Sequence, residues 1–189
     1  TSIDEIEEAK ALLLRACAEV SREMKCECIL PPVGIMLEVP SLVFMLPQLA
    51  HRVDFISIGT NDLTQYLLAV DRNNTHVALL YDNLHPALLR SLNIIALECQ
   101  RYQLPVSVCG EMAGTPMGAL LLIGLGFRQL SMSGRSLPRV KYLLRHLDPA
   151  ILQPFMQQVL KAETAIEIKK LSADFMERQG LGGLIRGGI

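Results

Sequence analysis

Four short strand-like runs, each followed by polar residues and then by a helical pattern, constrain the fold of this 189-residue chain most. The runs are residues 33–37, 53–58, 106–108 and 128–132. The first is wholly apolar, as is typical of a strand buried on both faces of a parallel sheet. Repeated strand–helix units imply parallel strands joined by right-handed crossovers. The sequence therefore predicts an α/β fold with about four parallel strands.

Helical periodicity accounts for most of the remaining chain. Ser2 and Glu5 form a predicted capping box at the start of the first helix. The predicted helices are residues 2–25, 41–50 with a break at Pro47, a segment from Leu63, a turn at 77–80, and then 86–102, 115–124, 138–146, 149–161 and 163–179. Residues 180–189 include five glycines. We expect residues 1–179 to form one domain and residues 180–189 to form a flexible tail.

Polar side chains follow the strands at the point where each strand ends. Glu38 follows the first run, Asn61 and Asp62 follow the second, and Cys109 follows the third. Active sites of (β/α)₈ barrels and open α/β sheets lie at the carboxyl ends of their strands. Arg72, further along the chain, offers the planar fork that a phosphate accepts in bidentate fashion. This pattern favours a site for a metal ion and a phosphorylated small molecule.

Each of these residues also has a purely structural interpretation. Asp62 could be a helix N-cap, with Gln65 completing a capping box. Glu38 could form an ion pair at a strand end, and Arg72 could pair with the neighbouring Asp71. Cys109 could be a buried free cysteine, because unpaired cysteine is among the most buried residue types. The four histidines have surface or capping roles in this interpretation, His85 as the cap of a helix.

Composition excludes several classes of protein. Hydrophobic residues make up 50% of the chain and charged residues 20%, with a net charge of −1. This is typical of a folded globular chain and gives no electrostatic footprint for nucleic acid. The apolar stretches are too short to span a membrane, and no signal peptide is visible. The chain begins Thr1-Ser2 without methionine, so we expect it to be part of a longer protein.

The five cysteines are odd in number and irregular in spacing, which argues against a secreted disulfide framework. We therefore expect a reducing, cytoplasmic location. Cys17 and Cys99 lie on apolar helix stripes and are predicted to be core residues.

Three motifs in order resemble those of one enzyme family. SIGTNDLTQYLLAVDRNN (57–74) resembles the signature of phosphoenolpyruvate-utilising enzymes, especially enzyme I of the phosphoenolpyruvate:sugar phosphotransferase system. GIMLEVP (34–40) resembles the metal-binding strand of that family, and VCGEMAG (108–114) resembles its catalytic cysteine loop. The residues around 37–41 and the Gly-rich tail resemble the nitrogen-regulatory version of enzyme I.

The resemblance implies a fold. Enzyme I has a (β/α)₈ barrel as its catalytic domain, and this chain matches the second half of that barrel. The first four strands and the separate domain with the phosphorylated histidine have no counterpart here. We therefore expect a half-barrel followed by extra helices, with unpaired edges at residues 33–37 and 129–132. Two copies are expected to associate as a homodimer, or the isolated chain is expected to aggregate.

The resemblance also implies roles for the strand-end residues. Glu38 and Asp62 match the ligands of Mg²⁺, while Asn61, Asp62 and Arg72 match contacts to phosphoenolpyruvate. Cys109 matches the proton donor that converts the enolate to pyruvate. In the family the phosphoryl group passes to a histidine and then to a carrier protein of sugar transport or nitrogen regulation. The isolated chain is expected to be inactive, because further substrate arginines of the family come from earlier strands.

Two alternatives remain at this point. A pyruvate phosphate dikinase or phosphoenolpyruvate synthase shares the GTNDLTQ run but departs around Cys109. A non-catalytic dimerisation or regulatory module would be expected to lose some of Glu38, Asp62, Arg72 and Cys109, and all four are present. Neighbouring domains would separate the enzymes: a nucleotide-grasp domain supports a dikinase, and a carrier-binding helical domain supports enzyme I.

Overall fold

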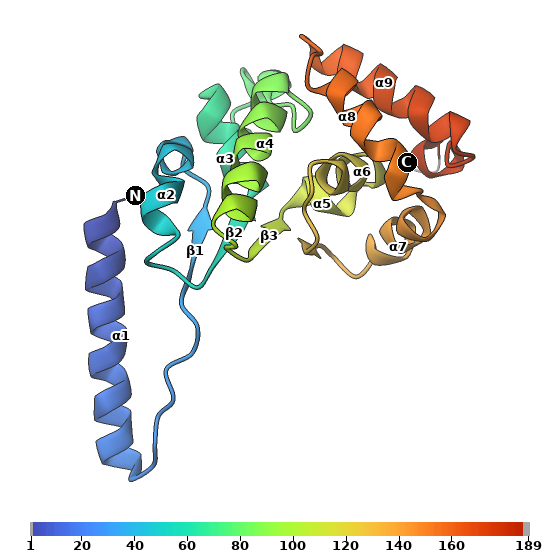
Figure 1. The fold of residues 1–189 in the computed structure, drawn as a ribbon. Helices are drawn as coiled ribbons and strands as arrows, with labels where there is room; N and C mark the ends of the chain where they lie inside the picture. Colours follow the sequence, from blue (N-terminus) through green and yellow to red (C-terminus); the bar gives the residue numbers. More distant parts are fainter. Residues whose placement is uncertain (1, 187–189) are drawn as a thin grey trace.

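A single parallel sheet organises the computed structural model, which describes residues 2–186. Its strands lie in the order of the chain, β1-β2-β3-β4, and every neighbouring pair is parallel (Figure 1). The strands are β1 (Gly34–Leu37), β2 (Phe55–Gly59), β3 (Val106–Cys109) and β4 (Leu130–Ser131). The sheet does not close, so the α/β half-barrel expected from the sequence is confirmed. The last strand is shorter than expected.

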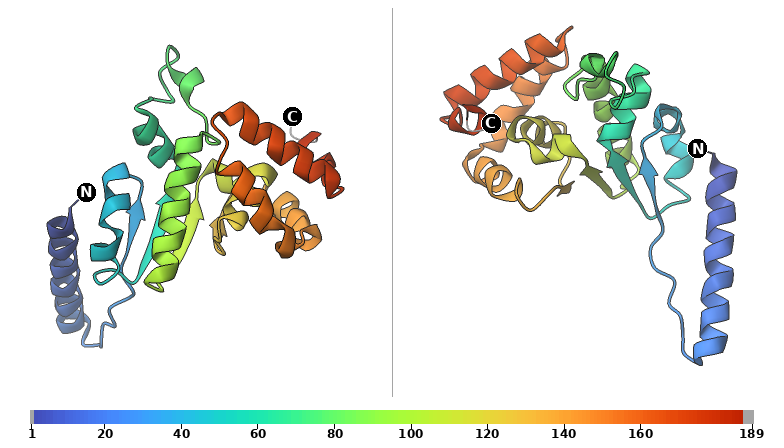
Figure 2. Two further views of the ribbon diagram at one scale, coloured as in Figure 1. Left: turned by 45° about the horizontal axis from the view of Figure 1, so that its top comes forward. Right: turned by 180° about the vertical axis from the view of Figure 1, so that it is seen from behind.

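Helices follow the strands and continue beyond them. The α-helices are α1 (Ile3–Met24), α2 (Leu46–Leu49), α3 (Thr60–Leu68), α4 (Pro86–Arg101), α5 (Glu111–Gly114), α6 (Pro116–Gly124), α7 (Leu137–His146), α8 (Leu152–Val159), α9 (Ala165–Arg178) and α10 (Gly183–Arg186). Short 3₁₀ segments cover Pro40–Met45, Ala78–Leu80 and Pro149–Ile151. The helices α7, α8 and α9 gather around α6, away from β1 (Figure 2). The short helices α5 and α10 were not expected from periodicity.

The two faces of the sheet differ sharply in burial. Leu37, Ile58 and Val108 lie in register across three strands, and all are 0% exposed beneath the helices. On the opposite face Met36 is 48% exposed and Phe55 is 38% exposed. The prediction that the first strand is buried on both faces is therefore wrong for this chain. The open face also carries Ser57 and the other residues that alternate with the core.

Helix α1 stands beside the rest of the molecule (Figure 1). It begins with the predicted capping box between Ser2 and Glu5. None of its residues is buried, although its apolar stripe was expected to pack. Lys10 Nζ donates to the carbonyl of Arg52 at 2.8 Å, which ties the helix to the loop before β2.

The cysteines depart in part from the sequence-based interpretation. Cys17 is not a core residue: it lies on the half-exposed side of α1 and forms a disulfide with Cys28, eleven positions away. Spacing alone did not indicate this pair, because the return of the chain beside α1 brings the two together. Cys99 is 2% exposed in the core, as predicted, and burial raises the pKa of its thiol to about 11.

The segment predicted to be a flexible tail packs where the structure describes it. Leu181 is 2% exposed, and Arg139 Nη2 donates to the carbonyl of Leu184 at 2.7 Å. Residues 187–189 lie outside the described residues, and the domain boundary at residue 179 stays a prediction. Among the helices of residues 2–186, none has the length and apolar character needed to cross a bilayer.

Candidate active site

The first residues of α3 show whether Asp62 is the N-cap of this helix. The helix begins at Thr60, its N-cap is Gly59, and no side chain caps it. Asp62 therefore lies inside the first turn, and its interpretation as the N-cap is wrong. Gln65 Oε1 accepts a hydrogen bond from the backbone N–H of Arg72 at 3.2 Å, so this side chain holds the following loop.

Glu38 lies at the same end of the sheet as Asp62. Glu38 follows the last residue of β1, and Gly59 is the last residue of β2. A Cβ atom built on Gly59 would lie 2.8 Å from Glu38 Oε2, so the carboxylate rests directly over this glycine. Within residues 2–186 Glu38 has no ion-pair partner. The two carboxylates thus follow neighbouring strands at one edge of the sheet.

Hydrogen bonds join the ends of β2 and β3. Thr60 Oγ1 donates to the carbonyl of Cys109 at 2.8 Å, and Asn61 Oδ1 accepts from the backbone N–H of Glu111 at 3.2 Å. Between them Gly110 has φ +116° and ψ 177°, a region open essentially to glycine alone. Two motifs that lie about fifty residues apart in sequence are therefore one structural unit.

Arg72 joins the same group through a different partner from the one considered in the sequence. Its Nη1 lies 3.6 Å from Glu111 Oε1, whereas Asp71 accepts from the backbone N–H of Asn73. The Glu111 side chain is 73% exposed, and an exposed pair of this kind contributes about 0–1 kcal/mol. A bound phosphate could therefore displace Glu111 from the guanidinium at little cost.

Tyr81 is a member of this region that sequence reasoning missed. Burial raises the pKa of its hydroxyl, and the nearby charges of Glu111 and Asp62 raise it further, while the Thr64 side chain and Arg72 oppose the shift. The Tyr81 ring thus lies near the charges of Asp62 and Arg72, which are predicted site residues, and of Glu111, which pairs with Arg72. Nothing in the spacing of the loop before α4 marked this tyrosine.

The thiol of Cys109 lies on the open face of the sheet. Its Sγ is 3.3 Å from the carbonyl oxygen of Ile58, 3.6 Å from Ser57 Oγ and 3.8 Å from Met36 Sδ. Cys109 is also one of the residues that line a cavity of about 590 Å³, together with Asn61, Glu111 and serine residues that include Ser131. Cys109 is thus half-buried beside a space that can admit a small molecule, and is not sealed in the core.

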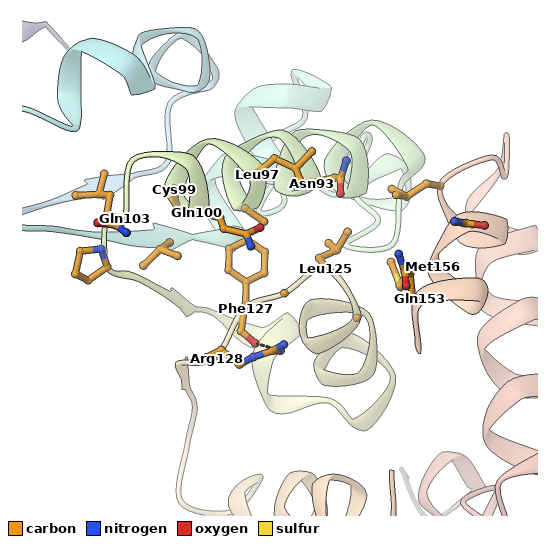
Figure 3. Close-up of a pocket in the computed structure, with 18 residues that line it drawn as sticks. Asn93, Leu97, Cys99, Gln100, Gln103, Leu125, Phe127, Arg128, Gln153 and Met156 are labelled. Atoms are coloured by element: carbon orange, nitrogen blue, oxygen red, sulfur yellow. Dashed lines mark hydrogen bonds between the residues drawn. The ribbon is translucent and has the colours of Figure 1, made fainter. Parts of the chain in front are cut away.

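A larger pocket lies at the opposite end of β3 and β4. It has a volume of about 930 Å³ and lies between α4, the turn before β4 and α8. Figure 3 shows the Phe127 ring directed toward α4 near Gln100. None of the site residues predicted from the sequence lines this pocket.

The donor set of the strand-end site fits one kind of metal. Among residues 2–186 no three His, Cys, Asp or Glu side chains come together as a preformed metal site. Zn²⁺ needs three or four such protein ligands. Mg²⁺ is typically held by one or two carboxylates, with substrate oxygens and water completing its coordination. Glu38 and Asp62 are thus two carboxylates of the kind that could hold Mg²⁺ together with substrate oxygens and water.

A parallel half-barrel with polar side chains at the carboxyl ends of its strands belongs to the α/β domains that carry their sites at that end of the sheet. Comparison with known proteins makes this specific. Residues 1–149 match the family model of the PEP-utilising enzyme, PEP-binding domain. The chain belongs to this family.

Several curated relatives are similar to the chain. Proteins named "Phosphoenolpyruvate-dependent phosphotransferase system" from Salmonella typhimurium and Escherichia coli are 59% and 58% identical over all 189 residues. A "Phosphoenolpyruvate-protein phosphotransferase" from Cupriavidus necator is 41% identical over 89% of the chain and 29% of its own length. The chain spans 25% of the length of the first two relatives.

Proposed function

We propose that this chain supplies the phosphoenolpyruvate-binding half-barrel of a phosphoenolpyruvate–protein phosphotransferase. The observation that carries the proposal is the convergence of three motifs at one edge of the sheet. Glu38 lies against Gly59, Asn61 bonds the backbone of Glu111, and Glu111 pairs with Arg72. The names of the relatives agree with this activity.

In this proposal Glu38 and Asp62 hold Mg²⁺. When bound, the ion would neutralise negative charge on the phosphate and carboxylate of phosphoenolpyruvate. The exposure of Met36, two residues before Glu38, supports a site that is completed by further strands of the intact barrel.

Arg72 and Asn61 bind the phosphoryl group. The Arg72 guanidinium donates to two phosphate oxygens, which favours both the bound substrate and the charge that is redistributed during transfer. The Asn61 oxygen is held by the Glu111 N–H, which leaves the amide nitrogen as its donor toward a substrate. Asp62 lies in the first turn of α3, where backbone N–H groups can donate hydrogen bonds to the phosphate oxygens.

Cys109 protonates the product. When the phosphoryl group leaves, the enolate of pyruvate needs a proton at its methylene carbon. The S–H bond of Cys109 breaks, its proton forms the new C–H bond, and the electron pair remains on sulfur as a thiolate. Water then returns a proton to the thiolate. General acid catalysis of this kind contributes roughly 10²–10⁴-fold.

The phosphoryl acceptor is a histidine outside this chain, which then passes the group to a carrier protein. Three of the four histidine side chains here have structural contacts: His85 Nδ1 caps α4 at Ala87 N–H, His146 Nδ1 lies 2.8 Å from the carbonyl of Tyr142, and the His51 ring packs edge-on against Tyr102. We therefore expect the isolated chain to transfer no phosphoryl group. From the sequence we propose the nitrogen-regulatory branch, which is tested by comparing carriers of the two branches.

The test uses the full-length protein that contains this chain, radiolabelled phosphoenolpyruvate and Mg²⁺. Labelling of the protein and of a carrier is expected in the wild type. Arg72→Ala should raise KM for phosphoenolpyruvate, and Cys109→Ala should slow pyruvate release roughly 10²–10⁴-fold. Arg145→Ala on α7 and Cys26→Ala, an exposed cysteine, are the matched controls. Normal turnover in both site variants would contradict the proposal.

We also propose that two copies of this chain associate as a homodimer. Both β1 and β4 lie at sheet edges with no strand beyond them within residues 2–186, and exposed edges favour association. Analytical ultracentrifugation of the isolated chain tests this directly, and a single monomeric species at micromolar concentration would refute it.

A further inference from the structure

On the open face of the sheet, one row of side chains lies next to Cys109, the candidate proton donor. Met36, Ser57 and Ser107 lie in register on β1, β2 and β3. Cys109 lies two residues beyond Ser107 on β3, so it projects from the same face. Ser57 therefore has the thiol as a diagonal neighbour, one strand away.

The contacts around the thiol have a defined direction. The Cys109 S–H can donate to the Ile58 carbonyl at 3.3 Å, and the Ser57 hydroxyl donates to the sulfur at 3.6 Å. Sulfur is a weak acceptor when protonated and a much better one as a thiolate, because a bond to an ionised partner is stronger. The Ile58 carbonyl, in contrast, can accept from the thiol but offers nothing to a thiolate.

We infer that Ser57 is a positioning residue for the proton transfer by Cys109. The inference rests on the proposed function and names the group that supports its proton donor. Before the transfer, the Ser57 hydroxyl fixes the sulfur in front of the cavity. As the proton leaves for the methylene carbon of the enolate, the S–H electron pair stays on sulfur. The hydroxyl bond then strengthens and stabilises the thiolate until water protonates it.

This role differs from that of an ordinary packing residue. Ser57 lies on the open face of the sheet, away from the helix-covered core of Ile56 and Ile58, so truncating it removes little packing. Its hydroxyl is in contact with the sulfur and is separated from the phosphate ligands at the strand ends. Loss of the hydroxyl should therefore slow protonation without weakening substrate binding.

The experiment follows the reverse of the protonation step. Full-length protein is incubated with pyruvate in D₂O together with Mg²⁺ and inorganic phosphate, which replaces the transferred phosphoryl group. Exchange of the methyl protons is followed by ¹H NMR. Cys109→Ala should abolish exchange. Ser57→Ala should lower kcat for exchange roughly 10- to 100-fold, the effect of one hydrogen bond to a charged group, with KM for pyruvate unchanged.

Two variants of equal shape isolate the hydroxyl. Ser57→Thr keeps the donor and should restore exchange, whereas Ser57→Val, which has the same shape without the hydroxyl, should behave like Ser57→Ala. Ser107→Ala, in register on β3, is the control and should exchange like the wild type. Thermal unfolding of each variant reports whether the fold is intact.

The outcomes separate the two proposals. If the wild type shows no exchange that depends on Cys109, the proposed function fails. If Cys109-dependent exchange is present and Ser57→Val retains it at the level of Ser57→Thr, the role of Ser57 is refuted. If Ser57→Ala instead raises KM for pyruvate and leaves kcat unchanged, the role of Ser57 is also refuted, because that result assigns Ser57 to substrate binding.

Discussion

Replacing Gly110 by alanine should test the junction between β2 and β3 most directly. Gly110 has φ +116° and ψ 177°, where alanine is strained by about 1–3 kcal/mol. A Cβ at this position would also lie within 3.0 Å of Thr60 Oγ1. Thr60 is 1% exposed and donates to the carbonyl of Cys109, so displacing its hydroxyl leaves buried polar groups unpaired. That loss costs about 1–3 kcal/mol.

The two contributions together predict that Gly110→Ala lowers the free energy of unfolding by about 2–6 kcal/mol. The chain offers two matched controls. Gly126 has φ +102° but open space around its Cα, so Gly126→Ala should cost only the backbone strain of about 1–3 kcal/mol. Gly134 has open space and no left-handed φ, so Gly134→Ala should change stability by less than about 1 kcal/mol.

Urea denaturation of the three variants and of Thr60→Ala gives the comparison. In the Thr60→Ala background the contact with the hydroxyl is absent and only the looser contact with Asn61 Oδ1 at 3.2 Å remains, so the cost of Gly110→Ala should fall toward that of Gly126→Ala. The double-mutant cycle should therefore show a coupling of about 1–3 kcal/mol between the two positions. If Gly110→Ala costs the same with and without Thr60, the contact that joins the two strand ends does not exist.

Three further results are expected. Burial raises the pKa of Cys99 from its ordinary 9.0 to about 11, so the unfolded chain deprotonates first and stability falls as pH rises from 9 to 11; the wild type should lose about 2–3 kcal/mol more over this range than Cys99→Ala in urea titrations. A non-reducing digest analysed by mass spectrometry should yield a peptide that links Cys17 and Cys28, and a link through another cysteine would contradict the fold of this segment. Calorimetry of the full-length protein should show Mg²⁺ binding in the presence of phosphoenolpyruvate weakened by both Glu38→Gln and Asp62→Asn, and unchanged affinity in either variant would remove that residue from the metal site.

Much of the fold was predictable because its determinants are local. The strand runs, the capping box at Ser2 and the His85 cap are written in short stretches, and each is confirmed in the structure. Parallel pairing then follows from the strand–helix alternation, which leaves few other topologies. The same logic placed Glu38, Asn61, Asp62 and Cys109 at one edge of the sheet.

What local patterns missed depends on contacts between distant segments. Arg72 pairs with Glu111 rather than with the adjacent Asp71, because the loops after β2 and β3 meet. The Cys17–Cys28 pair depends on the chain returning beside α1. Apolar periodicity in α1 indicated a helix but gave no information about whether a partner surface is present. Tyr81 was missed because its environment is created by residues of α3, of the loop that follows α3 and of α5.

Strand register has a consequence for how mutations reach the chemistry. Ile58 and Val108 are paired across β2 and β3, and both are fully enclosed by the helices. A one-residue slip between these strands would exchange the two faces of β3 and turn Cys109 into the apolar layer. A polar replacement of Ile58 or Val108 that shifts this register would therefore turn the Cys109 side chain away from the open face. Such a variant would be inactive although Cys109 itself is unchanged.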